Sequence, residues 1–142
     1  PPPSLLELMK SCGKQRNLLQ AFHIHSQIIL RNNLLPRDLS IPNALVRMYS
    51  HCGALEEAEE VFDDLISRNI VSWNALITGY SHHALGDKVL ECFRKMQDDD
   101  GLCPDVVTYI CVLKACGMVG SIDKWHGRNR LYSMTPCYTN TI

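Results

Sequence analysis

The sequence predicts an all-α protein, a right-handed α-solenoid of about four helix-turn-helix repeats. Three observations lead to this fold class. A segment of the chain recurs, apolar residues within each copy follow helical spacing, and small residues separate the apolar stretches. Two helices joined by a short turn cannot bury both of their apolar faces alone. Stacked pairs of helices can, and they then share a continuous core.

The internal repeat is clearest in two nine-residue segments. Residues 43–51 read NALVRMYSH and residues 74–82 read NALITGYSH, so six of nine positions are identical at an offset of 31. Weaker copies precede and follow these segments. An offset of 36 takes Val71 to Val107, and an offset of 37 relates the first copy to the second. One unit of 31 to 37 residues therefore appears four times.

Each unit is expected to contain two helices. In the third unit, apolar residues between positions 71 and 80 have near-helical spacing, and in the second unit residues 55–65 repeat at i, i+3, i+4 and i+7. Acidic residues favour the first turn of the second helices, as the helix dipole prefers (Glu56, Glu57, Asp87). The turns between paired helices are expected at small residues, which are Gly13, Gly53, Gly86 and Gly120.

Large apolar and sulfur-containing residues are expected in the core rather than around a cofactor. The Met and aromatic positions of this set are Met48, Tyr49, Phe62, Tyr80, Phe93 and Met96. Seven cysteines with no CxxC spacing indicate neither a disulfide framework nor a zinc ribbon. Cys12, Cys92, Cys111 and Cys116 lie in apolar helical patterns, where cysteine acts as a small buried hydrophobe, and this favours a reducing compartment.

Composition and motifs exclude several classes of function. The chain has 14 Lys and Arg against 15 Asp and Glu, a net charge of −1 that argues against a strongly basic nucleic-acid clamp. No apolar run approaches the ~18 residues of a membrane span. The histidine clusters at 23–25 and 82–83 have no carboxylate or cysteine beside them that would complete a set of metal ligands. Because nucleotide-binding, hydrolase and zinc-deaminase signatures are also missing, we expect no catalytic residues, no metal and no cofactor.

Several motifs resemble pentatricopeptide repeats. They are IVSWNALI at 70–77, PDVVTY at 104–109, NALVRMY at 43–49 and CGALEEA at 52–58. The alternating unit lengths resemble the plant P-L-S subfamily. By that resemblance, residues 2–38 form a long-type repeat, 39–69 a short-type repeat, 70–105 a P-type repeat, and 106–142 a long-type repeat that is degenerate or truncated at its end. The basic and aromatic segment at 124–130 departs most from the pattern.

The resemblance implies a module that binds single-stranded RNA, one base per repeat, in a mitochondrion or chloroplast. It further implies site recognition for C-to-U editing, with the chemistry supplied by a C-terminal extension or by editing-factor proteins. No DNA and no membrane are expected as partners. In this family the fifth and last residues of a repeat select the base. These positions pair Asn43 with Asn69, read as a pyrimidine and more often cytosine, and Asn74 with Asp105, read as uracil.

Other residues bear on this assignment. The resemblance implies that Val71 and Val107 sandwich the base. Leu6 and Ile110 hold the fifth position of the long units and cannot hydrogen-bond through their side chains. Scattered basic residues are candidates for phosphate contacts, although a solvated helix face is the simpler interpretation of each (Arg47, Arg68, Lys88, Arg94, Lys95, Lys114).

Two alternatives stay open at this point. Asn or Asp before a helix is commonly an N-cap, which would give these side chains a structural role. A tetratricopeptide-like solenoid that grips a peptide in its groove would share the helical pattern. The Asn and Asp pairs at unit-defined positions favour the RNA-binding interpretation.

Overall fold

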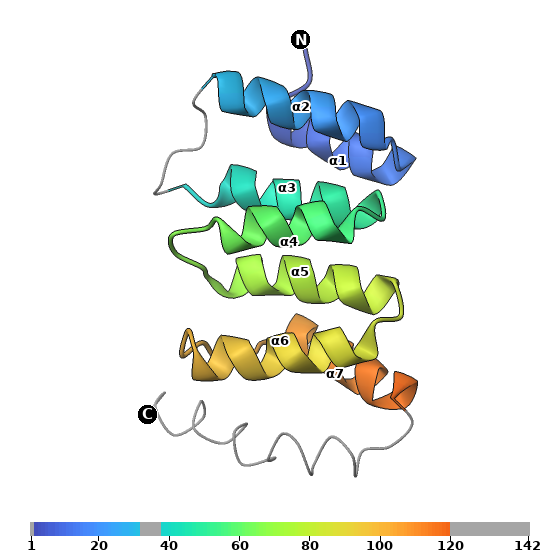
Figure 1. The fold of residues 1–142 in the computed structure, drawn as a ribbon, viewed down its shortest axis with the longest axis vertical. Helices are drawn as coiled ribbons and strands as arrows, with labels where there is room; N and C mark the ends of the chain where they lie inside the picture. Colours follow the sequence, from blue (N-terminus) through green and yellow to red (C-terminus); the bar gives the residue numbers. More distant parts are fainter. Residues whose placement is uncertain (1, 32–37, 120–142) are drawn as a thin grey trace.

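The computed structural model describes residues 2–31 and 38–119, which form seven α-helices and, within these ranges, no β-strand. The all-α prediction is confirmed. Figure 1 shows the helices stacked along the long axis of the molecule, from α1 and α2 at one end to α6 and α7 at the other. The helices are α1 (Leu5–Gln15), α2 (Leu18–Leu30), α3 (Ser40–His51), α4 (Leu55–Asp63), α5 (Ile70–His82), α6 (Gly86–Asp98) and α7 (Val106–Met118).

The helices form two rows. The odd-numbered helices α1, α3, α5 and α7 pack against one another in order along the stack. The even-numbered helices α2, α4 and α6 each pack on the odd-numbered helices of their own and the following hairpin. They cover one side of the first row, and we call the opposite side of that row the inner face. This arrangement is the stack of helical hairpins expected of a solenoid.

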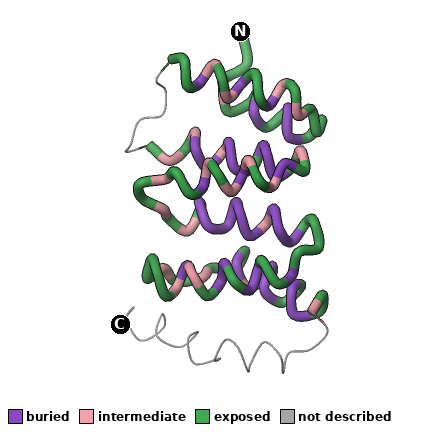
Figure 2. The backbone as a smooth tube through the Cα atoms, in the orientation of Figure 1, coloured by how far each residue is buried: buried purple, intermediate pink, exposed green. Residues whose placement is uncertain are grey.

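The core runs through the whole stack without a break. The six predicted Met and aromatic core residues and the four predicted buried cysteines are all buried, so these predictions are confirmed. Helix α5, in the middle of the stack, is buried along most of its length (Figure 2). Each hairpin thus buries surface against both neighbours, as repeat architectures require.

Three short turns join the paired helices. Gly53 has the predicted turn conformation, with φ of 79° between α3 and α4. The other two turns use residues other than glycine at positive φ, Arg16 with φ of 52° after α1 and Ala84 with φ of 57° before α6. The predicted turn at Gly120 lies outside the described residues.

Two of the predicted turn glycines were assigned wrongly, because both belong to helices. Gly13 lies inside α1, where an added Cβ would be 3.1 Å from Nδ1 of His51. Gly86 is the first residue of α6, and a Cβ there would be 3.0 Å from Cβ of Met118. At both positions the missing side chain lets two helices approach closely.

The predicted unit boundaries remain a prediction, and part of the fourth unit lies beyond the described ranges. Residues 120–142 include the basic and aromatic segment at 124–130. In the part of the chain that the structure describes, no helix is long and apolar enough to cross a membrane.

Candidate nucleic-acid interface

Two hollows on the inner face contain the six residues that the sequence singled out. The Asn43 hollow, of about 780 Å³, is lined by Asn43, Asn69 and Val71 among others. The Asn74 hollow, of about 550 Å³, is lined by Val71, Asn74, Asp105 and Val107 among others. Each hollow therefore holds one of the two predicted polar pairs. Val71 lines both hollows.

In the Asn74 hollow the two polar side chains bind each other directly. Nδ2 of Asn74, in α5, donates to Oδ1 of Asp105 at 2.9 Å. The buried hydroxyl of Thr108, in α7, donates to Oδ1 of Asn74 at 2.6 Å. Burial alone would raise the pKa of Asp105, but hydrogen bonds from Thr108 and Asn74 outweigh burial and lower it. Asp105 is therefore a carboxylate near pH 7 and accepts hydrogen bonds only.

In the Asn43 hollow the corresponding amide is not held in this way. Asn43 is 5% exposed, and its Oδ1 is buried without a hydrogen-bond partner. Asn69 turns its own Oδ1 toward the backbone N–H of Ser72, at 2.9 Å. A buried acceptor without a partner is costly in a folded protein, so a donor from a ligand would be favourable at this point.

The N-cap interpretation is correct for the residue at the last position of each repeat. It is wrong for the residue at the fifth position. Asn69 is the N-cap of α5 and Asp105 is the N-cap of α7, each in a capping box with the residue three positions on. Asn43 and Asn74 lie within α3 and α5 and cap neither helix. Capping and contact with a ligand are compatible for Asp105, because a carboxylate has about four acceptor sites.

Apolar side chains on the inner face stay exposed. Val71 is 41% exposed and Val107 is 47% exposed, and both line the Asn74 hollow. Leu6 and Ile110, at the fifth positions of the long units, are 46% and 48% exposed. Exposed apolar surface next to buried polar groups is typical of a ligand-binding surface.

Sequence reasoning missed a group of basic residues around the Asn74 hollow. Besides Arg47, the lining includes five residues that were not considered as ligands of RNA, Lys14, Arg16, His51, His82 and His83. The repeat itself contained the signal for two of them. His51 and His82 close the two nine-residue segments that match at an offset of 31. Their side-chain rings lie together on the structure, with centroids 6.2 Å apart.

The surroundings of His51 disfavour its protonated form. Burial lowers the pKa of His51, and the nearby positive charges of His82 and Arg47 lower it further. His83 is held differently, because its Nε2 lies 2.8 Å from the carbonyl oxygen of Ser50 and a carbonyl only accepts. The permanent positive charges beside Asn74 are therefore those of Lys14, Arg16 and Arg47.

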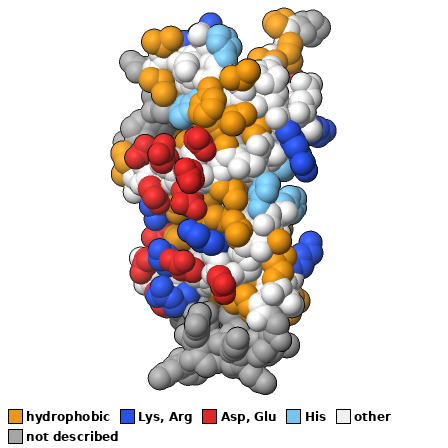
Figure 3. All heavy atoms as spheres, turned by 45° about the vertical axis from the view of Figure 1, so that its right-hand side comes forward, with side chains coloured by type: hydrophobic (Ala, Val, Ile, Leu, Met, Phe, Trp, Pro, Cys, Tyr) orange, Lys and Arg blue, Asp and Glu red, His pale blue; other side chains and the backbone are white. Residues whose placement is uncertain are grey.

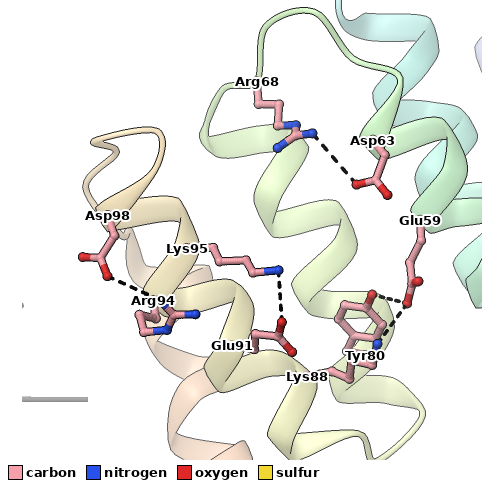
Figure 4. A network of polar contacts seen from close by, with 9 residues as sticks. All are labelled: Glu59, Asp63, Arg68, Tyr80, Lys88, Glu91, Arg94, Lys95 and Asp98. Atoms are coloured by element: carbon pink, nitrogen blue, oxygen red, sulfur yellow. Dashed lines mark hydrogen bonds and ion pairs between the residues drawn. The ribbon is translucent and has the colours of Figure 1, made fainter. Parts of the chain in front are cut away.

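The other candidate phosphate ligands are engaged elsewhere, with the exception of Lys114. Figure 4 shows four of them in ion pairs with acidic residues of α4 and α6. Lys95 lies 3.0 Å from Glu91, Lys88 3.6 Å from Glu59, and the arginines reach Asp63 and Asp98. Figure 3 shows acidic side chains gathered over α4 on this side of the molecule. This acidic side is unsuited to a polyanion.

Metal binding finds no support within residues 2–31 and 38–119, where no group of three or more His, Cys, Asp or Glu side chains could hold an ion. The six cysteines in these ranges are free thiols. Cys52 approaches Cys12 across the α1–α3 contact, and burial raises the pKa of Cys52 to about 11.

Stacked helical hairpins with polar residues in two adjacent inner hollows define a helical-repeat solenoid. Sequence comparison narrows this class. A model of the PPR repeat matches residues 41–70, and a model of the PPR repeat family matches residues 68–118. Together they cover more than half of the chain. The chain belongs to the pentatricopeptide repeat (PPR) family, as its motifs predicted.

Similar proteins are found in Arabidopsis thaliana. A chloroplastic pentatricopeptide repeat-containing protein is 38% identical over 130 residues, which is 91% of this chain and 15% of the relative. Another pentatricopeptide repeat-containing protein, whose name gives no organelle, is 35% identical over 135 residues, 95% of this chain and 22% of the relative. A relative named as mitochondrial is 44% identical over 92 residues, 65% of this chain and 14% of the relative. The chain spans less than a quarter of each of these relatives.

Proposed function

We propose that this chain is a non-catalytic, sequence-selective module that binds single-stranded RNA in organellar RNA processing. Its role in the whole protein is to recognise a transcript site for C-to-U editing. The editing chemistry belongs to a further segment or to a separate editing factor. Relatives named as chloroplastic and mitochondrial support a place in one of these organelles.

The observation that carries this proposal is the pairing of polar residues in two adjacent hollows. Asn74 and Asp105 meet across 31 residues of sequence at 2.9 Å, and Val71 and Val107 line the same hollow. A base between two valine side chains would stack on apolar surface while its edge meets the amide. One base per hollow matches one base per repeat.

The chemistry of Asn74 suits a pyrimidine edge. Its amide donates one N–H to Asp105 and accepts one hydrogen bond from Thr108. One N–H donor and one acceptor site of the amide therefore remain for a base. A pyrimidine presents a donor and an acceptor side by side on its Watson–Crick edge. A peptide would have no use for such a pair at a fixed position in successive units.

Phosphate contacts are proposed for the basic residues that line the Asn74 hollow. Lys14, Arg16 and Arg47 carry permanent charge there. Neutralising about three phosphates predicts a slope near −2 when log K is plotted against log salt, since each contact contributes about −0.7 on a single strand.

The test uses the whole chain and short single-stranded RNAs. We would titrate hexamers that carry CU, UC, CC, UU, AA or GG at the centre of an otherwise constant sequence and follow binding by NMR. Two base contacts of about 1–3 kcal/mol each predict dissociation constants above the micromolar range. Asn74→Thr is expected to move the preference at one position from uracil toward a purine.

A matched pair of charge variants tests the phosphate contacts. Arg47→Gln on the inner face should weaken binding to every hexamer and flatten the salt dependence. Arg94→Gln removes the same charge from the outer side, where Arg94 pairs with Asp98, and should leave binding unchanged. Equal affinity for all hexamers with and without Asn74→Thr would refute base selection. Binding to a peptide library with no RNA binding would favour the tetratricopeptide-like alternative.

A further inference from the structure

We propose that Thr108, a residue of the following unit, fixes the orientation of the Asn74 amide and thereby sets the choice between uracil and cytosine. This inference rests on the proposed RNA-binding function. Thr108 is 0% exposed and lies in the first turn of α7, beneath the Asn74 hollow. It therefore acts as a positioning residue that reaches the base only through Asn74.

The hydrogen bonds around Asn74 permit only one arrangement. Asp105 is a carboxylate and accepts only, so the amide must turn its Nδ2 toward it. The backbone N–H of Asp105 donates to Oγ1 of Thr108 at 3.2 Å. The hydroxyl oxygen of Thr108 lies 2.6 Å from Oδ1 of Asn74 and 3.1 Å from Oδ1 of Asp105. Because the hydroxyl has one proton and the first distance is shorter, it donates to Asn74.

A flipped amide would lose both of these bonds. Its oxygen would face the carboxylate of Asp105, where no proton lies between two acceptors. Its nitrogen would face Oγ1 of Thr108, which already accepts from the backbone N–H of Asp105. That oxygen could accept the amide only if its own proton turned from Asn74 to Oδ1 of Asp105, 3.1 Å away. Because Asn74 is 8% exposed, water cannot readily replace the lost partners.

The amide orientation matters because uracil and cytosine present opposite patterns. Uracil offers the O4 acceptor beside the N3–H donor, and cytosine offers the N4–H donor beside the N3 acceptor. An amide held one way complements one of these edges, and the flipped amide complements the other. A locked amide therefore separates two pyrimidines, while a free amide accepts both.

The neighbouring hollow provides an internal contrast. Ser72 occupies the position equivalent to Thr108, and it too is fully buried in the first turn of its helix. Its hydroxyl donates to Oδ1 of Asn69 at 3.0 Å, and Oδ1 of Asn43 has no partner. Within the described residues no hydrogen bond to Oδ1 fixes the orientation of the Asn43 amide, so we expect this hollow to select pyrimidines without separating them.

The test compares Thr108→Val, which removes the hydroxyl and keeps both branches of the side chain, with Thr108→Ser, which restores the hydroxyl. We expect Thr108→Val to reduce the ratio of uracil to cytosine affinity at the Asn74 position by about fivefold, which is the loss of one hydrogen bond. The ratio of pyrimidine to purine affinity in Thr108→Val should stay within about twofold of that of the unmodified chain. Thr108→Ser should recover the ratio.

Two measurements separate this role from a structural one. Ser72→Ala removes the equivalent capping hydroxyl, and it should leave the uracil-to-cytosine ratio at the Asn74 position unchanged. Hydrogen exchange of the Asn74 side-chain amide, followed by NMR without RNA, should be slow in the unmodified chain and several-fold faster in Thr108→Val. The exchange measurement tests whether the Asn74 amide is held in one orientation even if Thr108→Val is too unstable for titration. In that case the exchange rate of the Asn74 side-chain amide is compared with that of the Asn43 side-chain amide in the unmodified chain.

The outcomes are distinct. If the unmodified chain binds no RNA or does not distinguish bases, the proposed function fails, and so does the effect of Thr108 on base choice. If the chain does distinguish uracil from cytosine and folded Thr108→Val keeps the same ratio, the role of Thr108 is refuted while the proposed function stands. An Asn74 amide that exchanges as fast as that of Asn43 in the unmodified chain would also refute the lock.

Discussion

Replacing Gly79 by alanine tests how closely α3 and α5 approach in the middle of the stack. A Cβ at position 79 would lie 2.7 Å from Cβ and 2.5 Å from Oγ of Ser50. Carbon atoms in contact lie about 3.5–4.0 Å apart, so the gap is short by roughly 1 Å. Both Cβ atoms are fixed to helix backbones, and Ser50 is 4% exposed. Only a shift of one helix against the other can relieve this overlap.

The expected magnitude is a difference between two effects. Overpacking of a core costs about 1–3 kcal/mol, and the overlap at Gly79 places it in the upper part of that range. Alanine gains about 1 kcal/mol over glycine within a helix. Gly79→Ala should therefore lower the free energy of unfolding by about 1–2 kcal/mol. For a chain of this size the melting temperature should fall by roughly 4–8 °C.

The assay is thermal and urea unfolding followed by circular dichroism, with Gly117→Ala as the matched control. Gly117 lies in α7, and an added Cβ there would meet nothing within 4 Å. This control should be neutral or stabilising by up to about 1 kcal/mol. In a Ser50→Gly background both close atoms are absent, so Gly79→Ala should then cost nothing. The reasoning about close approach is refuted if Gly79→Ala alone matches or exceeds the stability of the unmodified chain.

Three further predictions concern titratable groups. The pKa of His51 is lowered from 6.5 by burial and neighbouring charge, so the unfolded chain protonates first and stability falls as the pH drops below about 6.5. Urea midpoints at pH 7.5 and 5.5 should show a smaller decline in His51→Gln, and RNA affinity should rise more on acidification in the unmodified chain than in this variant. The pKa of Asp105 is lowered from 3.8, so its contribution is present at neutral pH and lost as the pH falls through the folded-state value. Asp105→Ala should cost about 1 kcal/mol through the lost cap, and Asp105→Asn should keep most of it in urea unfolding at pH 7. Maleimide at pH 8 should label exposed Cys103 much faster than Cys92, because burial raises the pKa of Cys92 to about 12. Peptide mapping by mass spectrometry measures the order of labelling, and the reverse order would contradict the packing described for Cys92.

The fold class could be predicted from the sequence because each copy of the repeat indicates the same pair of helices. Each unit buries the same positions, so a weak helical signal in one unit is supported by its equivalents in the others. The two glycine errors have a different origin. A glycine between two apolar stretches looks the same in sequence whether it forms a turn or lets a neighbouring helix approach. Gly13 and Gly86 do the latter, against His51 and Met118, which are far from them in sequence.

The sequence could indicate which candidate residues would lie close together, but it could not indicate their contacts. The family resemblance paired Asn74 with Asp105, and the structure places them in one hollow at 2.9 Å. That Asn69 and Asp105 would also cap their helices was foreseen as an alternative to a binding role, and the structure shows capping for both. The hydrogen bond from Thr108 to Asn74 depends on how α5 packs on α7, which no spacing in the sequence contains.

The net charge of −1 misleads because it averages over two faces that the repeat keeps apart. Equivalent positions in successive units fall on the same side of a solenoid, so charge that looks scattered in sequence gathers in rows. Helix α4 carries acidic residues over its outer surface, while the region around the Asn74 hollow collects the permanent charges of Lys14, Arg16 and Arg47. Basic residues on the outer side are neutralised in ion pairs there, as Lys88 is by Glu59. A polyanion would therefore meet an attractive inner face and a repulsive outer one. For the proposed binding of RNA, the distribution of charge over the two faces is therefore the relevant quantity, rather than its sum.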